Sequence, residues 1–218
     1  MKTPFAVLIS GSGTNLQALI DAAASPEYPG QVRLVISNRR DAYGLQRARD
    51  AGIEALWIAH RGRSRAAFEA EVLAALAARG IEWIALAGFM RLLSPDFLAV
   101  HAGRVLNIHP ALLPAFPGLH GARQAVAYGV RIAGATVHFV DAGTDTGPII
   151  LQGAVPVRAT DDAAELAARI LTVEHQLYPR ALALALSGKL VIEGRRVRLP
   201  ADEPGFLWGG GALSSSDD

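Results

Sequence analysis

Short apolar runs alternate along the first half of the chain with longer segments in which apolar residues recur every three or four positions. The short runs have the length expected of strands and lie at 5–10, 32–37, 54–59, 82–88 and 104–108. The longer segments have a helical period and lie at 15–24, at 43–52, from Ser64 to Gly80, and after Ser94-Pro95. Strands that alternate with helices predict right-handed crossovers and a parallel sheet covered on both faces.

The second half of the chain has a different pattern. The runs "IAGATVHFV" (132–140) and "PIILQGAVPV" (148–157) are long strands joined by a glycine-rich loop, which favours antiparallel pairing. A helix over 161–187 follows, and Pro179 inside it predicts a kink. After the helix we expect a hairpin with its turn at Glu193-Gly194.

We therefore expect one α/β domain over 1–200. Its open, mostly parallel, twisted sheet would be Rossmann-like, with helices on both faces, C-terminal antiparallel strands and a long helix. The polar and glycine-rich end of the chain predicts a disordered tail over 201–218.

Composition narrows the classes of function. Of the 218 residues, 51% are hydrophobic, which is enough for a sizeable core, and the net charge of +1 with scattered Lys and Arg argues against a nucleic-acid partner. The absence of cysteine excludes disulfides and thiolate catalysis, and no histidine or carboxylate pattern has metal-ligand spacing, so we expect no metal. No apolar run suits a signal peptide or a membrane span, so we expect a cytoplasmic protein without a membrane partner.

The stretch "LISGSGTNLQALI" (8–20) combines a strand, a glycine-rich turn and the start of a helix. Backbone N–H groups at a helix N-terminus favour an anion, so a monophosphate site is one interpretation. A dinucleotide fingerprint would need glycine where Leu16 stands, and a P-loop would need G-K-S/T at 16–18. The alternative is a tight turn capped by Thr14 or Asn15.

The stretch "VLNIHPALLP" (105–114) ends an apolar strand with polar side chains. Asn107 and His109 lie on the same face of an extended segment, at the C-terminal edge where open α/β sheets bind their ligands. An amide can donate to a developing oxyanion and an imidazole can carry a proton or stabilise charge. The alternative is a strand end whose polar groups only satisfy neighbouring loops.

The stretch "VDAGTDTGPII" (140–150) places Asp141 and Asp145 in a loop before an apolar strand. One of them would orient His109 in a histidine–acid pair, although the spacing does not distinguish the two. The alternative is a solvated turn. The remaining histidines are interpreted as structural or surface residues: His60, His101, His120, His138 and His175.

These segments together resemble the folate-dependent formyltransferases over about residues 5–200. The resemblance rests on "LISGSGTNLQALID", "SNRRDAYGLQRARDAGI", "LAGFMRLLS", "AGRVLNIHPALLPAFPGLH", "VHFVDAGTDTGPIILQ" and "EHQLYPRAL", in this order along the chain. It is closest to the branch that formylates a ribonucleotide of de novo purine (IMP) biosynthesis. The sequence has "HPALLP" where the family has "HPSLLP", and Gly121-Ala122 follow "PGLH" where some relatives have a second histidine.

The resemblance implies direct transfer of a formyl group from 10-formyltetrahydrofolate, as co-substrate, to the amine of 5'-phosphoribosylglycinamide. The step would pass through a tetrahedral intermediate, without a covalent enzyme adduct or a metal. The implied residues are the catalytic Asn107, His109 and Asp145; Gly13, Thr14, Asn15 and Glu174 for the ribonucleotide; and Arg65, Met90, Arg91, Leu92, Leu93, Asn107, Asp141 and Asp145 for the folate.

Other functions fit less well. Relatives that formylate a tRNA carry an RNA-binding domain after the shared segment, and hydrolases of formyltetrahydrofolate carry a domain before it, so length argues against both. A dehydrogenase would need the missing third glycine, and titration with NADH would test it. A catalytically inactive binding protein has no support, since the three catalytic positions are intact. The oligomeric state is left open, with a homodimer as one alternative.

Overall fold

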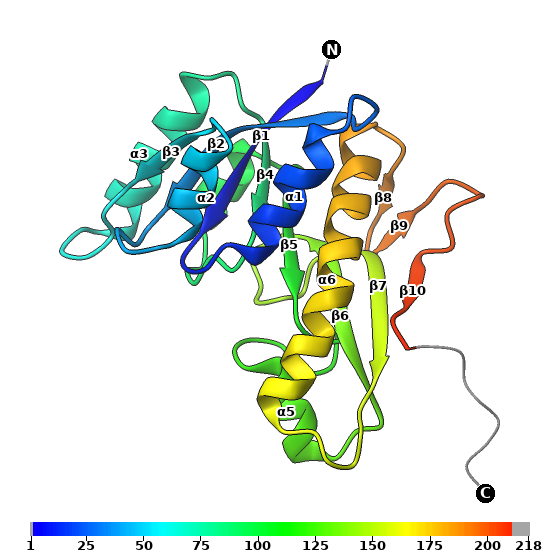
Figure 1. Cartoon of the computed structure of the whole chain (residues 1–218). Helices are drawn as coiled ribbons and strands as arrows, with labels where there is room; N and C mark the ends of the chain where they lie inside the picture. The colour runs from blue at the N-terminus through cyan, green and yellow to red at the C-terminus, as the bar shows by residue number, and fades with distance from the viewer. Residues whose placement is uncertain (1, 211–218) are drawn as a thin grey trace, which may run out of the picture.

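The computed structural model describes residues 2–210. The first half alternates strands and helices, as the sequence predicts (Figure 1). Its elements are β1 (Thr3–Ile9), α1 (Thr14–Ala24), β2 (Gly30–Ser37), α2 (Gly44–Asp50), β3 (Glu54–Trp57), α3 (Arg65–Ala77), β4 (Trp83–Leu86), α4 (Pro95–Val100) and β5 (Val105–His109).

The second half contains the long antiparallel strands and the long helix. Its elements are α5 (Gly121–Tyr128), β6 (Ile132–Phe139), β7 (Ile149–Pro156), α6 (Ala163–Leu186), β8 (Val191–Glu193), β9 (Arg196–Arg198) and β10 (Phe206–Trp208). The predicted hairpin is present as β8 and β9, which pair antiparallel. Pro179 lies inside α6, and the predicted kink stays a prediction.

The strands described in 2–210 form one ten-stranded sheet in the order β3-β2-β1-β4-β5-β6-β7-β9-β8, with β10 pairing to β7. Neighbours from β3 to β5 are parallel, whereas β6 runs antiparallel to both β5 and β7. The predicted fold class is therefore confirmed. The sheet changes direction at β5, so the polar end of that strand lies beside an antiparallel neighbour.

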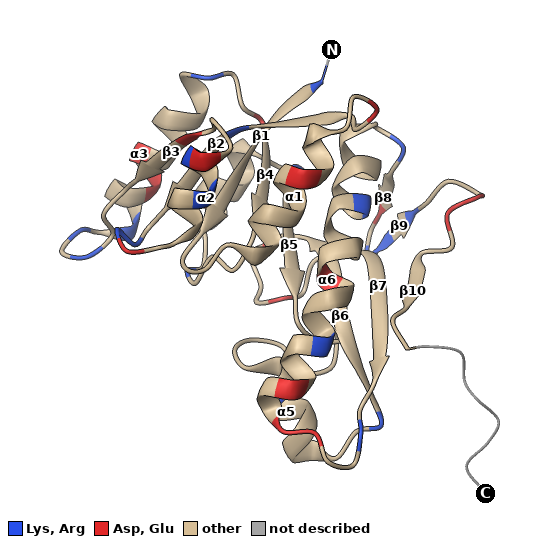
Figure 2. Ribbon diagram, viewed as in Figure 1, with Lys and Arg blue, Asp and Glu red and all other residues tan. Residues whose placement is uncertain are grey.

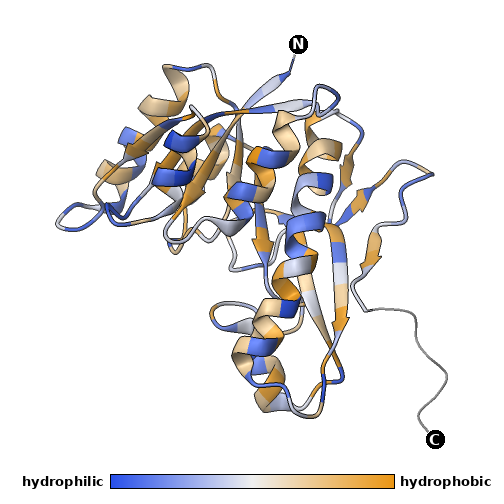
Figure 3. Cartoon of the chain, in the orientation of Figure 1, coloured by the Kyte–Doolittle hydropathy of each residue, from blue (hydrophilic) through white to orange (hydrophobic). Residues whose placement is uncertain are grey.

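Helices cover both faces of the sheet. One face packs against α1, α2, α5 and α6 through residues such as Leu16, Leu45 and Leu177, and the other against α3 and α4 through residues such as Phe68 and Phe97. Figure 3 shows the same division, with orange strands in the centre and blue positions on the outer sides of the helices. Burial of these apolar side chains is the main favourable contribution to folding.

Helix caps agree with the sequence at two starts. The hydroxyls of Ser64 and Ser94 accept hydrogen bonds from the backbone N–H groups of Ala67 and Phe97, each at 3.1 Å. At α6 the cap is Asp162, which forms a reciprocal capping box with Glu165.

The prediction of a disordered tail from residue 201 is wrong for 206–208. These residues form β10, which pairs parallel with Gln152, Gly153 and Ala154 of β7. The sequence does not predict this strand, because three residues show too little periodicity to indicate one. Pairing with β7 supplies its stability. Residues 211–218 of the predicted tail lie outside the described residues.

Helix α5 was also absent from the elements predicted from the sequence.

Within residues 2–210, no helix combines the length and the apolar character that crossing a membrane requires.

The phenol of Tyr178 ties α6 to the centre of the sheet. The side chain is fully buried, and its hydroxyl lies 2.9 Å from the carbonyl oxygen of Leu86 and 3.1 Å from that of Leu106. These carbonyls belong to the adjacent strands β4 and β5. The hydroxyl therefore holds the helix against the two strands that lead into the polar sheet edge.

We expect Tyr178→Phe to lower the free energy of unfolding by about 1–2 kcal/mol, because two buried carbonyls lose a shared donor. The matched control is Tyr128→Phe, since Tyr128 is 80% exposed and its hydroxyl makes no hydrogen bond within the described residues. Urea unfolding monitored by circular dichroism measures both. Equal losses in the two variants would contradict the role of the Tyr178 hydroxyl.

Candidate active site

The antiparallel pairing of β5 with β6 places the polar residues of the two strands opposite one another. In this register Asn107 pairs with His138 and His109 pairs with Thr136. Asn107 and His109 share one face of β5, as the sequence predicts, because side chains alternate along a strand. The site is thus built from two neighbouring strands rather than from the end of one.

His138 fixes the orientation of the Asn107 amide. The Nδ1 atom of His138 lies 2.8 Å from the carbonyl oxygen of Phe139, to which it donates, so Nε2 is left as an acceptor. Asn107 Nδ2 lies 3.2 Å from this Nε2 and donates to it. Burial lowers the pKa of His138 below 6.5, which keeps the ring neutral at neutral pH. The second N–H of the Asn107 amide remains available for another acceptor.

His109 lies between two acceptors. Its Nε2 is 2.8 Å from the carbonyl oxygen of Phe116, and its Nδ1 is 3.3 Å from Oδ2 of Asp145. Each neutral tautomer would turn one ring lone pair toward an oxygen, either that of the Asp145 carboxylate or that of the Phe116 carbonyl. A ring that donates through both nitrogens would satisfy both acceptors.

Asp145 connects three parts of the site. Its Oδ2 accepts a hydrogen bond of 2.7 Å from the backbone N–H of Gly118 and faces His109, and its Oδ1 lies 3.7 Å from His138 Nε2. This last contact is not an ion pair while His138 is neutral. Asp145 has a φ of 55°, and Phe116 and His120 also have positive φ. Such strained positions gather at functional sites, where the surrounding structure holds them.

The loop after β5 is held by a buried threonine of β6 and a half-buried glutamine of β7. The hydroxyl of Thr136 donates to the carbonyl of Ala111 at 2.7 Å and accepts from the backbone N–H of Leu113 at 3.0 Å. Gln152 Nε2 donates to the carbonyl of Leu113 at 2.9 Å. These bonds place the Phe116 carbonyl and the Gly118 N–H against His109 and Asp145.

A pocket of about 300 Å³ opens beside this cluster. Asn107, His138 and Asp145 form its polar wall, whereas His109, which is only 4% exposed, lies behind that wall. The remainder of the lining is mostly apolar side chains and loop backbone: Leu86, Phe89, Met90, Arg91, Leu92, Leu93, Leu119, Val140, Asp141, Ala142, Gly143 and Thr144. A mostly apolar pocket with a few convergent polar groups is typical of a small-molecule site.

Asp141 and Asp145 differ in what they contact. Asp141 Oδ1 accepts from the backbone N–H of Gly143 and the hydroxyl of Thr146, so it holds the shape of its own loop. Asp145 instead reaches across to the loop after β5. The sequence left open which of the two aspartates pairs with His109. The structure distinguishes them, because of the two only Asp145 approaches His109.

The glycine-rich turn before α1 lies at the same sheet edge. Gly13 is the N-cap residue with a φ of 73°, and no side chain caps the first turn, so neither Thr14 nor Asn15 takes the capping role that one interpretation gave it. A Cβ at Gly13 would come within 2.7 Å of Gly44 Cα, whereas a Cβ at Gly11 would meet nothing within 4 Å. Uncapped N–H groups at a helix N-terminus suit an anion.

Asn15 and Glu174 join α1 to α6 beside this turn. Asn15 Nδ2 donates to Glu174 Oε2 at 2.6 Å, and Asn15 Oδ1 is buried without a partner within the described residues. Burial raises the pKa of Glu174 above 4.5, and the hydrogen bond from Asn15 opposes part of that effect. Burying an ionised carboxylate at this position lowers the stability of the fold, which marks Glu174 as a candidate for function.

The structure does not bring every residue of the predicted site to the pocket wall. The folate residues of the prediction line the pocket except Arg65, which begins α3 and lies one turn before Phe68. His138 was grouped with structural or surface histidines, and the structure places it against Asn107 in the wall. Only the strand pairing could reveal that contact. Within residues 2–210, no group of three or more histidine or acidic side chains is arranged to hold a metal.

Comparison with known proteins agrees with this architecture. Residues 3–182 match the family described as "Formyl transferase". The chain is 48% identical over 185 residues to the phosphoribosylglycinamide formyltransferase of Escherichia coli, covering 84% of this chain and 87% of that one. It is 50% identical over 190 residues to the trifunctional purine biosynthetic protein adenosine-3 of Drosophila melanogaster, covering 86% of this chain but only 14% of that one.

A solved structure supports the same relationship. Glycinamide ribonucleotide transformylase 1 from Symbiobacterium toebii superposes with a TM-score of 0.89 at 54% identity, over 91% of this chain and 94% of that chain. The sequence match and the shared fold lead to one conclusion. The chain belongs to the formyl transferase family.

Proposed function

We propose that this chain is a phosphoribosylglycinamide formyltransferase. It would transfer the formyl group of 10-formyltetrahydrofolate to the amine of 5'-phosphoribosylglycinamide, giving formylglycinamide ribonucleotide and tetrahydrofolate in de novo purine biosynthesis. The observation that carries the proposal is the cluster of Asn107, His109 and Asp145 beside an apolar pocket, at the sheet edge where the turn before α1 also lies. The named activities of the relatives support it.

The pocket suits a folate. Its apolar wall can accept a pteridine, and the backbone of the loop over 141–145 offers hydrogen bonds to the polar edge of the ring. The turn over 11–15 would hold the phosphate of the ribonucleotide, and Glu174 would contact its ribose or glycinamide part. The amine of one substrate would then meet the formyl carbon of the other beside Asn107.

The chain's residues can stabilise the charges of the reaction. When the amine attacks the formyl carbon, the carbonyl oxygen becomes negative and the nitrogen positive. The free N–H of Asn107 would donate to the oxygen, and the charge of His109 would act from behind the wall, since electrostatic stabilisation does not require contact. Asp145 would keep the His109 ring oriented through its contact with Nδ1.

The reaction closes with a proton transfer. The proton lost by the attacking nitrogen would pass, by way of water near Asp145, to N10 of the folate as the bond from N10 to the formyl carbon breaks. No covalent bond to the enzyme forms and no metal is needed. The cytoplasmic location and the absence of nucleic-acid and membrane partners stay predictions.

The first test addresses the catalytic cluster. We expect His109→Ala and Asp145→Ala each to lower kcat by about 10² or more, the usual effect of removing an acid–base or oxyanion-stabilising group. Asp145 acts largely through His109, so the double variant should be little worse than the worse single variant. A steady-state assay that follows deformylated folate measures kcat.

The matched control is Asp141→Ala, which removes a carboxylate from the same loop without touching His109 and should lower kcat much less. Circular dichroism should show an intact fold in each variant. A His109→Ala enzyme with more than about a tenth of the wild-type kcat would show that His109 is an ordinary strand-end residue.

The second test addresses the phosphate. Gly11→Val places a side chain in open space before the helix, so we expect the KM for the ribonucleotide to rise by about tenfold or more while the KM for the folate changes by less than about twofold. Thermal unfolding should remain near that of the wild type. Equal rises in both KM values would remove the phosphate from this turn.

The third test uses the pH dependence of stability. The pKa of Glu174 is raised by burial, so its ionised form destabilises the folded state, and this cost grows as the pH rises above 4.5. We expect Glu174→Gln to raise the free energy of unfolding by about 1 kcal/mol at neutral pH, with no gain near pH 4. The KM for the ribonucleotide should rise in the same variant.

Urea unfolding at the two pH values measures the stability change. A gain that is the same at both would mean that ionisation of Glu174 is not its source.

A further inference from the structure

Helix α2 packs against the glycine-rich turn over 11–15. A Cβ at Gly13 would lie 2.7 Å from the Cα of Gly44 and 3.5 Å from the Cδ of Arg47, so this helix touches the backbone of the turn. Figure 2 shows blue on α2, whose last turn carries Arg47 and Arg49. The turn is therefore backed by a helix that brings positive charge close to it.

Two successive carbonyl groups of the turn accept hydrogen bonds from α2. The backbone N–H of Gly44 donates to the carbonyl oxygen of Gly11 at 3.1 Å, and Nε of Arg47 donates to that of Ser12 at 2.9 Å. The C=O and N–H of a planar trans peptide unit point in opposite directions. The N–H groups of Ser12 and Gly13 therefore point away from α2, and neither has an acceptor within residues 2–210.

Two such N–H groups can bind one anion together. Successive backbone N–H groups in a turn that contains a left-handed residue form a concave site for anions, and Gly13 has φ 73° and ψ 34°. The donors of Ser12 and Gly13 lie in the turn where the proposed function places a phosphate. Their direction depends on the two carbonyl groups that α2 holds.

The guanidinium of Arg47 is itself held in place. Besides its bond to Ser12, Nη1 donates to Oε1 of Gln17 at 3.3 Å, and the guanidinium carbon lies 5.0 Å from the ring centroid of Tyr43. Gln17 is fixed in turn by its bond of 2.8 Å to Asp21. A charged donor on a carbonyl polarises the peptide unit, which makes the N–H at its other end a stronger donor.

From these contacts we propose that Arg47 is a positioning residue of the phosphate site. It fixes the peptide between Ser12 and Gly13 so that the Gly13 N–H faces the phosphate, and its charge strengthens that donor through the peptide. This inference rests on the proposed function, which places the phosphate of the ribonucleotide at the turn over 11–15. Arg47 then acts on the phosphate end of the acceptor and not on the folate.

The test compares two acceptors, 5'-phosphoribosylglycinamide and the same molecule without its phosphate. For the wild type we expect kcat/KM to be about 10²-fold or more higher with the phosphate. Arg47→Met keeps the length of the side chain but has no donor at the position of Nε. In this variant the ratio should fall about tenfold or more, while kcat/KM for the acceptor without phosphate stays within about twofold of the wild type.

Two further variants separate a backbone donor from a charge that acts on the phosphate. In Arg47→Gln the amide nitrogen occupies the position of Nε, so a neutral donor should restore part of the ratio. Arg47→Lys keeps the charge but has carbon at that position. Recovery in Arg47→Gln that exceeds recovery in Arg47→Lys supports the proposal, and the reverse order or equal recovery overturns it. This comparison decides the question even if Arg47→Met does not fold.

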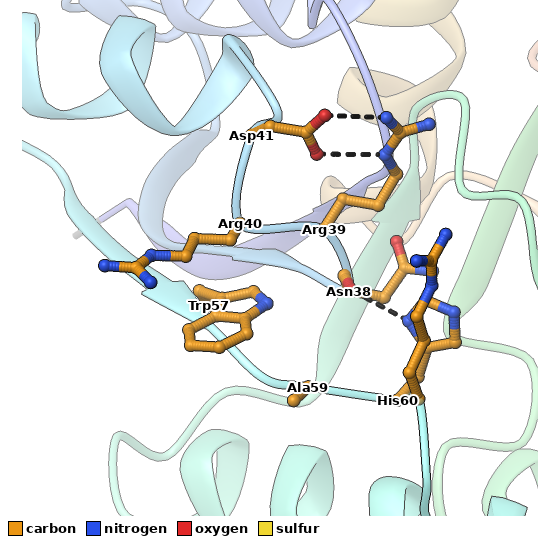
Figure 4. A pocket seen from close by; sticks show the side chains of 8 residues that line it. Asn38, Arg39, Arg40, Asp41, Trp57, Ala59 and His60 are labelled. Carbon is orange, nitrogen blue, oxygen red and sulfur yellow. Dashed lines mark hydrogen bonds and ion pairs between the residues drawn. The ribbon is translucent and has the colours of Figure 1, made fainter.

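The matched control is Arg40→Met. Arg40 also lies over an aromatic ring, with its guanidinium carbon 5.6 Å from the ring centroid of Trp57. Figure 4 shows it in a separate pocket, which Arg39 and Arg61 also line, and within the described residues it makes no hydrogen bond to the turn. The ratio of the two acceptors should stay within about twofold of the wild type. A fall as large as that in Arg47→Met would overturn the specific role of Arg47.

The two proposals fail in different ways. A wild-type enzyme that formylates neither acceptor would contradict the proposed function. Transfer to both acceptors, with equal losses of kcat/KM in Arg47→Met, would leave the proposed function intact and overturn the role of Arg47. Thermal unfolding near that of the wild type would accompany the expected result, since the proposed role concerns the direction of two N–H groups and not the stability of α2.

Discussion

The antiparallel pairing of β5 with β6 is the constraint on which the site depends. If β6 continued the parallel order, His138 would not face Asn107, and the chain after β6 would leave the sheet at its opposite edge. Because β6 runs the other way, its C-terminal end lies beside the start of β5, and Val140 N–H donates to the carbonyl of Val105 at 2.9 Å. The loop that follows then returns along the pocket and brings Asp145 to His109.

Local sequence patterns predicted much of this structure. Strand and helix periods predicted the parallel half, and alternation placed Asn107 and His109 on one face. The choice between Asp141 and Asp145 could not come from spacing, since it depends on how a loop closes onto Gly118, which is 27 positions away from Asp145. β10 was missed for a similar reason, because its three residues become a strand only when β7 offers its backbone.

The net charge of the chain does not show where its charged side chains lie. A net charge of +1 gave no indication of a basic region, yet arginines from three separate segments meet at one sheet edge. Their convergence follows from the topology, since the segments after parallel strands all begin at the same edge. The net charge of the whole chain argued against a nucleic-acid partner, whereas the local positive potential at this sheet edge bears on the binding of small anions.

The contact between Gly13 and Gly44 also bears on how such a chain can evolve. A Cβ at Gly13 would lie 2.7 Å from the Cα of Gly44, so Gly13 cannot be replaced without moving the start of α2, whereas a Cβ at Gly44 would meet the Cδ1 end of the Ile9 side chain at 2.4 Å. Two residues 31 positions apart are thus coupled through the absence of side chains. A lineage that replaced Gly13 would have to shift α2 in the same step, which leaves few accessible paths of neutral drift at this position.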